Sequence, residues 1–143
     1  MREILFRGKR KDNNKWIYGN LYHQKYYSGH RYFIIKRIGI VIDDNKVIDM
    51  NIIRAEEIIP ETVGQYTGIK DENGEKIFEG DIIEYRDDIG EIMGKGIVEY
   101  DYKNGGYEVI RPNLNYYPMV LSPYGRIIGN KYDNPELLGG GKE

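Results

Sequence analysis

A hairpin marked by two glycines is written twice in this chain, and no other feature constrains its fold as much. Residues 6–8 read Phe-Arg-Gly and residues 66–68 read Tyr-Thr-Gly. A polar stretch follows each, and then two apolar residues, one variable residue, Gly, Asn or Asp, and an aliphatic residue, at 16–21 and 77–82. The offset is 60 residues before the polar stretch and 61 after it, so one residue is inserted where loops tolerate insertions.

The second glycine of each copy, with its polar follower, predicts a structural turn. Glycine within a strand pattern marks a bulge, a bend or a close backbone approach, and a following Asn or Asp can bond nearby backbone. We therefore interpret Gly19-Asn20 and Gly80-Asp81 as structural turns. An acidic site at Asp81 is the alternative, but the equivalent residue in the first copy is the neutral Asn20.

Strand signals dominate the rest of the chain. Short isoleucine-rich runs alternate with turn sequences such as Asn73-Gly74 and Asn104-Gly105-Gly106, which favour tight hairpins. The expected fold is all-β, built as SH3-like β-barrels in two similar lobes or as one pseudo-duplicated barrel domain. Asn134 and Pro135 predict a short C-terminal helical turn.

The pattern divides the chain into three parts. We expect a basic, aromatic-rich β lobe over residues 1–60, an acidic SH3-like lobe over residues 61–138, and a flexible tail over residues 139–143. Residues 1–62 hold 12 Lys or Arg against 8 Asp or Glu, and residues 63–143 hold 9 against 15. The resulting net charges of +4 and −6 suit nucleic acid at one end of the molecule, or head-to-tail contact between copies in a homo-oligomer.

Composition excludes several classes of site. The chain has no cysteine, which rules out disulfides, thiolate metal sites and a cysteine nucleophile. No apolar run approaches the roughly 20 residues of a membrane span, and the N-terminus lacks the apolar region of a secretion signal. We expect a cytoplasmic protein with no membrane contact, no bound metal and no cofactor.

The N-terminal half contains the strongest candidate site, where aromatic and basic residues interleave. Single-stranded nucleic acid is held by this combination, with bases stacked on rings and phosphates met by cations. Strand alternation places Trp16, Tyr18 and Tyr22 on one face. The candidate nucleic-acid-binding residues are Trp16, Tyr18, Tyr22, Lys15, Lys25 and Arg31. Packing in a small core, or an interface with a protein of the bacterial host or with another copy, is the competing interpretation.

An enzyme is the alternative class, and we expect it less than a binding module. His23 and His30 are the only histidines and suit acid–base cleavage of RNA. A carboxylate-bound metal for nucleotide processing would need several acidic residues to converge. The acidic candidates are Glu79, Asp81, Glu84, Asp87, Asp88 and Glu91.

Three separated blocks of the sequence resemble the YopX family. The central block runs from Thr62 to Gly68 and continues through Asn73-Gly74 to Glu79-Gly80-Asp81-Ile82. The N-terminal residues 2–7 and the C-terminal residues 128–138 resemble the two ends of that family. The resemblance implies an SH3-barrel-like fold and an origin in a phage or prophage of a bacterial host, and it implies no catalytic residues.

Overall fold

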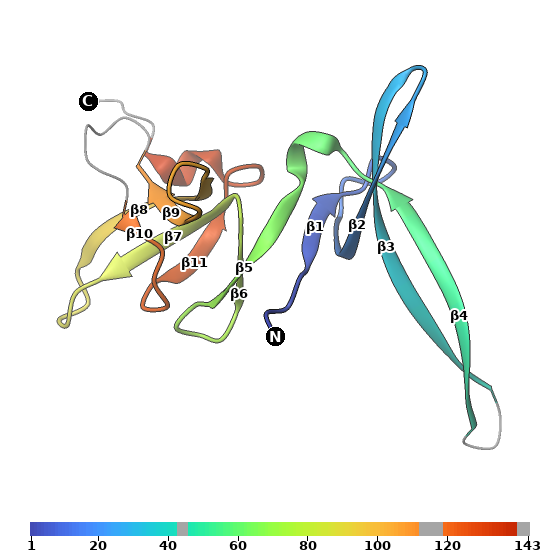
Figure 1. Ribbon diagram of the computed structural model, residues 1–143. Coiled ribbons are helices and arrows are strands. Elements are labelled where there is room, and N and C mark those ends of the chain that lie inside the picture. Colours follow the sequence, from blue (N-terminus) through green and yellow to red (C-terminus); the bar gives the residue numbers. More distant parts are fainter. Residues whose placement is uncertain (43–45, 112–118, 140–143) are drawn as a thin grey trace. The chain divides into compact units, whose positions relative to one another are not determined.

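The computed structural model describes residues 1–42, 46–111 and 119–139, with the backbone alone at residues 37–42 and 46–52. Its strands are antiparallel, and the described residues contain no α-helix. The predicted all-β class is therefore confirmed (Figure 1). No helix in these ranges is long and apolar enough to cross a membrane.

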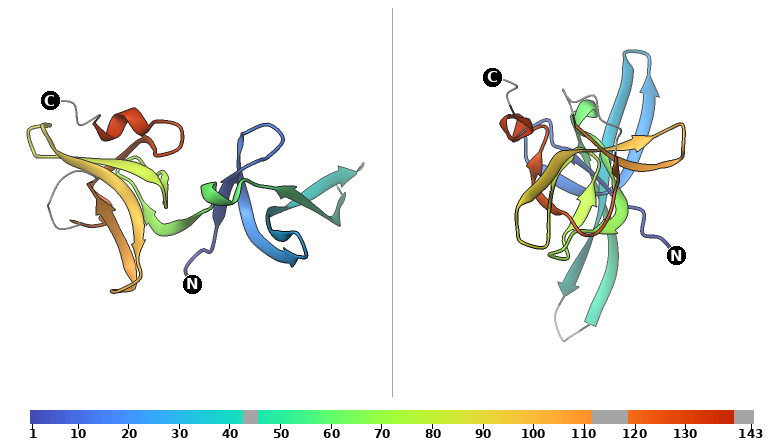
Figure 2. Two further views of the ribbon diagram at one scale, coloured as in Figure 1. Left: turned by 90° about the horizontal axis from the view of Figure 1, so that it is seen from above. Right: turned by 90° about the vertical axis from the view of Figure 1, so that its left-hand side faces the viewer.

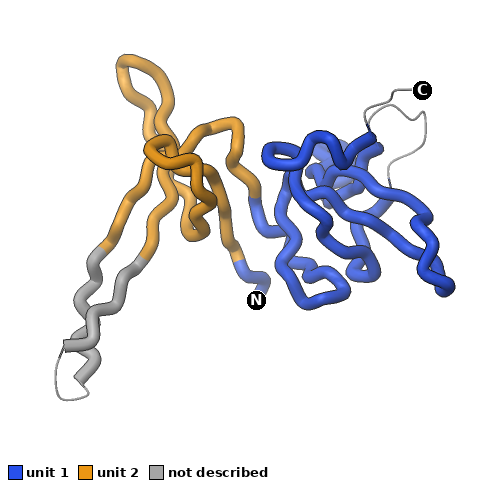
Figure 3. Tube along the Cα trace, turned by 180° about the vertical axis from the view of Figure 1, so that it is seen from behind, with its two compact units in different colours: residues 1–3, 65–143 blue, residues 4–64 orange. Residues whose placement is uncertain are grey.

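The chain separates into two compact units, coloured in Figure 3. Unit 2 holds residues 4–64, and unit 1 holds residues 1–3 and 65–143. The predicted lobe boundary after residue 60 falls at a 3-10 turn, η1 (Pro60–Thr62), a few residues before the division at Gly64. Residues 140–143 of the expected tail lie outside the described residues.

Unit 2 is a meander of four strands in the order β4-β3-β2-β1. The strands are β1 (Phe6–Lys9), β2 (Trp16–Tyr26), β3 (Gly29–Ile42) and β4 (Lys46–Glu57). Each strand pairs with the next through a short connection. Ile17, Ile34 and Ile58 form the buried core on one face of this sheet.

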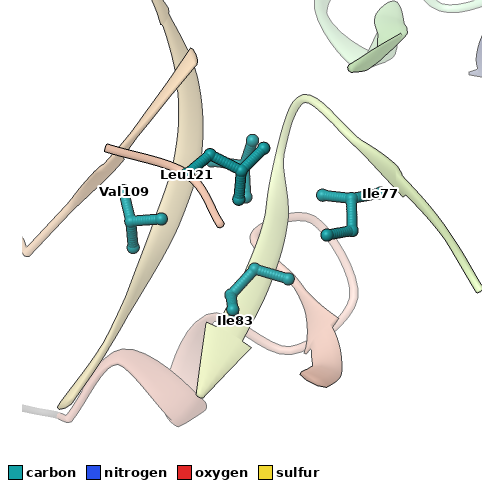
Figure 4. Packing of buried hydrophobic residues seen from close by; sticks show 5 residues of the cluster. Ile77, Ile83, Val109 and Leu121 are labelled. Carbon is teal, nitrogen blue, oxygen red and sulfur yellow. The ribbon is translucent and has the colours of Figure 1, made fainter. Parts of the chain in front are cut away.

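Unit 1 contains the β5–β6 hairpin and a five-stranded sheet in the order β10-β9-β8-β7-β11. The strands are β5 (Gly64–Lys70), β6 (Lys76–Phe78), β7 (Asp81–Arg86), β8 (Ile92–Asp101), β9 (Gly106–Ile110), β10 (Met119–Val120) and β11 (Arg126–Asn130). A cluster of buried side chains from β6 to the segment after β10 forms its core. Figure 4 draws the cluster and labels Ile77, Ile83, Val109 and Leu121, which come from different elements.

The predicted SH3-like barrel is not observed in either unit. A barrel closes only when its outer strands pair with each other. In the five-stranded sheet of unit 1 the outer strands are β10, with two residues, and β11, at the opposite edge. Neither sheet closes on itself in the described residues. Neither form of the prediction, two barrel lobes or one pseudo-duplicated barrel, is therefore observed.

The C-terminal turn is a 3-10 turn, η2 (Pro135–Leu138), which lies against β8 (Figures 1 and 2). Asn134 precedes it as expected, but its side chain does not cap it. The Oδ1 atom of Asn134 instead accepts a hydrogen bond of 3.2 Å from the backbone N–H of Asn130.

The two predicted structural turns have different backbones. Gly19 lies within β2, and a Cβ there would stand 2.4 Å from the carbonyl oxygen of Ile35 on β3. Gly80 lies between β6 and β7 with φ +88°. Asp81 is buried and accepts a 2.7 Å hydrogen bond from the N–H of Phe78, whereas Asn20 is exposed in the middle of β2.

Candidate nucleic-acid interface

The sheet of unit 2 has one core face and one aromatic face. Ile17 of β2 points into the core with Ile34 and Ile58. Because successive strand side chains point to opposite faces, Trp16, Tyr18 and Tyr22 stand on the other side. We call this side, with Arg7, Lys9, Tyr26, Arg31 and Phe33 of the neighbouring positions, the aromatic face.

Trp16 is half-buried under the cations of β1. The guanidinium of Arg7 lies 4.6 Å from the centre of the Trp16 ring, and the Nζ atom of Lys9 lies 5.4 Å from it. Tyr18 and Tyr22 are 41% and 45% exposed. Tyr18 and Tyr22 are therefore the most exposed rings of the aromatic face, and Trp16 is covered by Arg7 and Lys9.

Arg31 contacts two further rings of the aromatic face, those of Tyr26 and Phe33. Its guanidinium lies 5.2 Å from the ring centres of both Tyr26 and Phe33. Phe33 is directly opposite Tyr22 in the β2–β3 register, with ring centres 6.2 Å apart. The hydroxyls of Tyr22 and Tyr26 donate to the Oε1 atom of Gln24, at 3.4 and 2.9 Å. The contacts with Arg31 and Gln24 hold these rings in place without a ligand.

Glu57 at the end of β4 fixes the direction of Arg31. Arg31 donates through Nε and Nη2 to the two carboxylate oxygens, at 2.9 and 2.6 Å, and Lys11 donates to the same carboxylate at 3.0 Å. The two cations lower the pKa of Glu57 from 4.5 to about 2. Arg31 is thus a positioned cation whose charge is partly offset, which weakens its attraction for a phosphate.

The six residues predicted for the site divide between three places. Trp16, Tyr18, Tyr22 and Arg31 share the aromatic face. Lys25 pairs with His30 and belongs to the opposite face. Lys15 is exposed in the β1–β2 turn, where its N–H bonds to Asn13.

The two histidines lie on the core side of the β2–β3 hairpin, beyond the core itself. Strand pairing brings the Nε2 atom of His23 within 2.6 Å of the Nδ1 atom of His30. The ring of His23 stacks on the rings of His30 and Tyr32, with ring centres 4.8 and 4.4 Å apart. Two imidazoles bonded to each other do not face a scissile bond from two sides, so the geometry gives no support to RNA cleavage here.

Four of the six acidic candidates bind the backbone or the cations of unit 1, namely Glu79, Asp81, Glu84 and Asp87. Glu84 is buried and pairs with Arg86 and Arg126, at 2.8 and 3.1 Å. The Oδ1 atom of Asp87 accepts the N–H groups of Ile89 and Glu91 in the β7–β8 turn. Within the described ranges, no three His, Asp or Glu side chains gather as a metal would need.

The six candidates leave out Arg7, Lys9, Tyr26 and Phe33 of the aromatic face, and also Gln24 and Glu57, which bond to its side chains. Tyr26 continues the spacing of Tyr18 and Tyr22, so alternation alone would have found it. Gln24 carries no distinguishing signal. Glu57 lies 26 residues from Arg31 and meets it only through the β3–β4 pairing.

Comparison with known proteins supports the fold and a family. The family model described as YopX protein matches residues 5–139. The crystal structure of protein EF1440 from Enterococcus faecalis is similar over 96% of this chain and 99% of that one, with 22% identity and a TM-score of 0.50. At that identity the likeness concerns the fold alone. No curated protein matches the chain.

Proposed function

The chain belongs to the YopX family, and we propose that it is a non-enzymatic binding module that holds single-stranded nucleic acid on the aromatic face of unit 2. The observation that carries the proposal is the exposure of Tyr18 and Tyr22 on the face opposite the core. A stacked aromatic contributes about 1–3 kcal/mol per base and tolerates any base sequence.

The spacing of the two tyrosines favours an extended strand as the ligand. Tyr18 and Tyr22 are four positions apart on β2, which separates their backbones by about 13 Å. Each ring therefore receives a different base. The net charge of +4 over residues 1–62 supplies the general attraction for phosphates that makes such binding salt-dependent.

The proposed setting follows the family resemblance. We place the protein in the cytoplasm of a bacterial host as an accessory protein of a phage or prophage. The competing use of the aromatic face is contact with a host protein or with the acidic half of another copy, since tyrosine and tryptophan are also enriched in protein interfaces.

Fluorescence anisotropy with labelled single-stranded DNA and RNA tests the proposal. We expect binding that weakens steeply between about 50 and 200 mM salt. Tyr22→Ala should weaken it by about 1–3 kcal/mol, and Tyr22→Phe, which keeps the ring, should retain most of it. Tyr124→Ala is the matched control, because Tyr124 is 80% exposed in unit 1.

Two results would overturn the proposal. One is the absence of binding at low salt, and the other is an equal loss with Tyr22→Ala and Tyr124→Ala. Light scattering of the same samples measures the mass in solution and so tests for self-association. A dimer that depends on Tyr22 and has no affinity for nucleic acid would assign the aromatic face to contact between copies.

A further inference from the structure

Unit 1 contains a cavity of about 310 Å³ beside the β8–β9 hairpin. Its walls include three tyrosines, a carboxylate and one arginine from the N-terminal segment. The residues used below are Tyr100, Tyr102, Tyr107, Glu79, Thr67 and Arg2. Because 310 Å³ is at the small end of ligand sites, the cavity fits one side chain or a molecule of similar size.

The ring of Tyr100 is nearly perpendicular to the rings of Tyr102 and Tyr107. Tyr100 and Tyr102 have ring centres 4.9 Å apart and an interplanar angle of 75°. Tyr100 and Tyr107, which face each other across β8 and β9, are 5.2 Å apart at 74°. These are edge-to-face ring contacts, and all three rings also line the cavity, where ring faces attract a cation.

The turn between β8 and β9 holds the most exposed ring in place. Asp101 accepts hydrogen bonds from the N–H of Lys103 at 2.9 Å and from the Asn104 amide at 2.6 Å. Its carbonyl also accepts the N–H of Gly105 at 2.8 Å, with Gly105 at φ +73°. Tyr102 therefore stands on an ordered turn, although it is 88% exposed.

Glu79 places a carboxylate on the wall of the same cavity. It is half-buried, and its Oε1 atom accepts the N–H of Gln65 at 3.1 Å. Burial raises the pKa of Glu79, and Lys131 opposes this by favouring the ionised form. The pKa of Tyr107 is raised by burial and by the Glu79 charge, which places the carboxylate close to that ring.

The unit that contains the cavity is acidic, whereas the lining itself carries one carboxylate, Glu79, and one guanidinium, Arg2. Residues 63–143 carry a net charge of −6. Glu99 is near enough to act on Glu79, and Asp101 and Glu99 act in the same way on Glu108 at the other side of the hairpin. Arg2, the cation on the wall, belongs to an exposed arm whose side chain lies over Gly68.

We propose that this cavity, the tyrosine cage, binds the cationic side chain of a lysine or arginine presented by a partner polypeptide. The rings surround the alkyl stem and the charge, and Glu79 pairs with the cation. Gly106 on the rim has no neighbour within 4 Å of where a Cβ would stand, so a peptide backbone can approach there. This inference does not depend on the aromatic face of unit 2.

Titration of the full chain with acetyl-Gly-Arg-Gly-amide and acetyl-Gly-Lys-Gly-amide, followed by amide NMR shifts, tests the proposal. We expect shifts at Tyr102, Gly105 and Tyr107, and no shifts with acetyl-Gly-Gln-Gly-amide, which lacks the charge. Tyr102→Ala should weaken binding about two- to thirty-fold, the range for loss of one cation–π contact. Tyr124→Ala, a change at another exposed tyrosine of unit 1, should leave it unchanged.

Two further variants test the sign of the charge. Glu79→Gln should weaken the binding of the cationic peptides. Arg2→Gln should leave their binding intact or strengthen it, because Arg2 places a like charge on the cavity wall. Unchanged amide shifts at Ile83 and Val98 would show that each variant is folded. Equal binding of the glutamine peptide, or loss of binding in Arg2→Gln, would overturn the proposal.

Discussion

The two copies of the glycine-marked hairpin share a sequence pattern and fold into different backbones. Gly19 is in the middle of a continuous strand, whereas Gly80 forms a bend with positive φ between two strands. The first glycine is required because the Ile35 carbonyl occupies the space of a side chain. The second is required because L-residues rarely adopt φ near +88°. A repeated glycine therefore identifies a constrained position without revealing which constraint applies.

The residue before each glycine differs in chemistry, and both proposed sites use it. In the first copy it is Tyr18, on the aromatic face of unit 2. In the second copy it is Glu79, on the wall of the tyrosine cage. The residue between the first aromatic and the first glycine behaves likewise, since Arg7 supports Trp16 and Thr67 lines the cage. The shared pattern supplies the scaffold, and the two proposals assign the ligand contacts to the variable positions.

Gly19→Ala should have the largest effect of the changes that separate the two copies. A methyl group would stand 2.4 Å from the Ile35 oxygen and 2.9 Å from the Cγ2 atom of Ile34, so β2 and β3 must move apart. We expect a loss of about 3 kcal/mol in the free energy of unfolding of unit 2. Urea unfolding followed by Trp16 fluorescence measures it, because the chain has a single tryptophan. A loss below that of Gly80→Ala would reverse the interpretation of the two glycines.

Asp81→Ala and Asn20→Ala compare the stability that each unit gains from the polar residue after its glycine. Asp81 is 2% exposed, and its removal takes an acceptor from the N–H of Phe78. An unsatisfied buried donor costs about 2 kcal/mol. Asn20 is exposed, so Asn20→Ala should cost less than about 0.5 kcal/mol. Urea unfolding by circular dichroism measures both, and equal losses would show that the two turns are equivalent after all.

Gly80→Ala should cost about 1–2 kcal/mol in unit 1, the usual penalty for an L-residue in a left-handed conformation. Gly80→Asn should cost less, because asparagine tolerates that region better. At Gly19, asparagine should cost at least as much stability as alanine, because any Cβ there meets the Ile35 carbonyl. Amide hydrogen exchange of β7 and β8 measures the local loss. Rescue by asparagine at both glycines would remove the distinction.

Acid should act with opposite sign on a carboxylate of each unit. The pKa of Glu57 is lowered to about 2 in the folded chain, so ionised Glu57 stabilises unit 2 above pH 4.5. That contribution is lost as the pH falls from 4.5 toward 2, and Glu57→Gln should remove this part of the pH dependence. Burial raises the pKa of Glu79, so ionised Glu79 costs stability, and this cost is relieved as the pH falls.

Unfolding at several pH values, with Trp16 fluorescence for unit 2 and NMR amide signals for unit 1, separates these two effects. The expected differences are the smallest of the series because Glu57 is paired at the surface, where water screens the interaction. A Glu57→Gln variant with the pH profile of the original chain would show that its pairs with Arg31 and Lys11 are energetically neutral.

Local patterns in the sequence predicted the class of fold and part of the aromatic face. Strand and turn signals gave the all-β class, which is confirmed, and strand alternation placed Trp16, Tyr18 and Tyr22 together. The SH3-like barrel is not confirmed, since neither sheet closes in the described residues. Closure depends on which strands pair at the sheet edges, and this information is not local. The Arg31–Glu57 pair and the tyrosine cage also depend on pairing between distant segments, since 28 residues separate Glu79 from Tyr107.

The order of the strands also bears on how the chain folds during synthesis. Every strand of unit 2 pairs with its immediate neighbour in sequence, so its sheet can form as residues 4–64 leave the ribosome. Unit 1 must wait, because β11 pairs with β7 and the Oδ2 atom of Asp71 accepts the N–H of Ile127 at 3.1 Å, 56 residues later. Contacts of long sequence separation form slowly. A nascent chain halted before residue 126 should therefore hold a folded first half and an exposed, unpaired edge at β7, the form most exposed to aggregation.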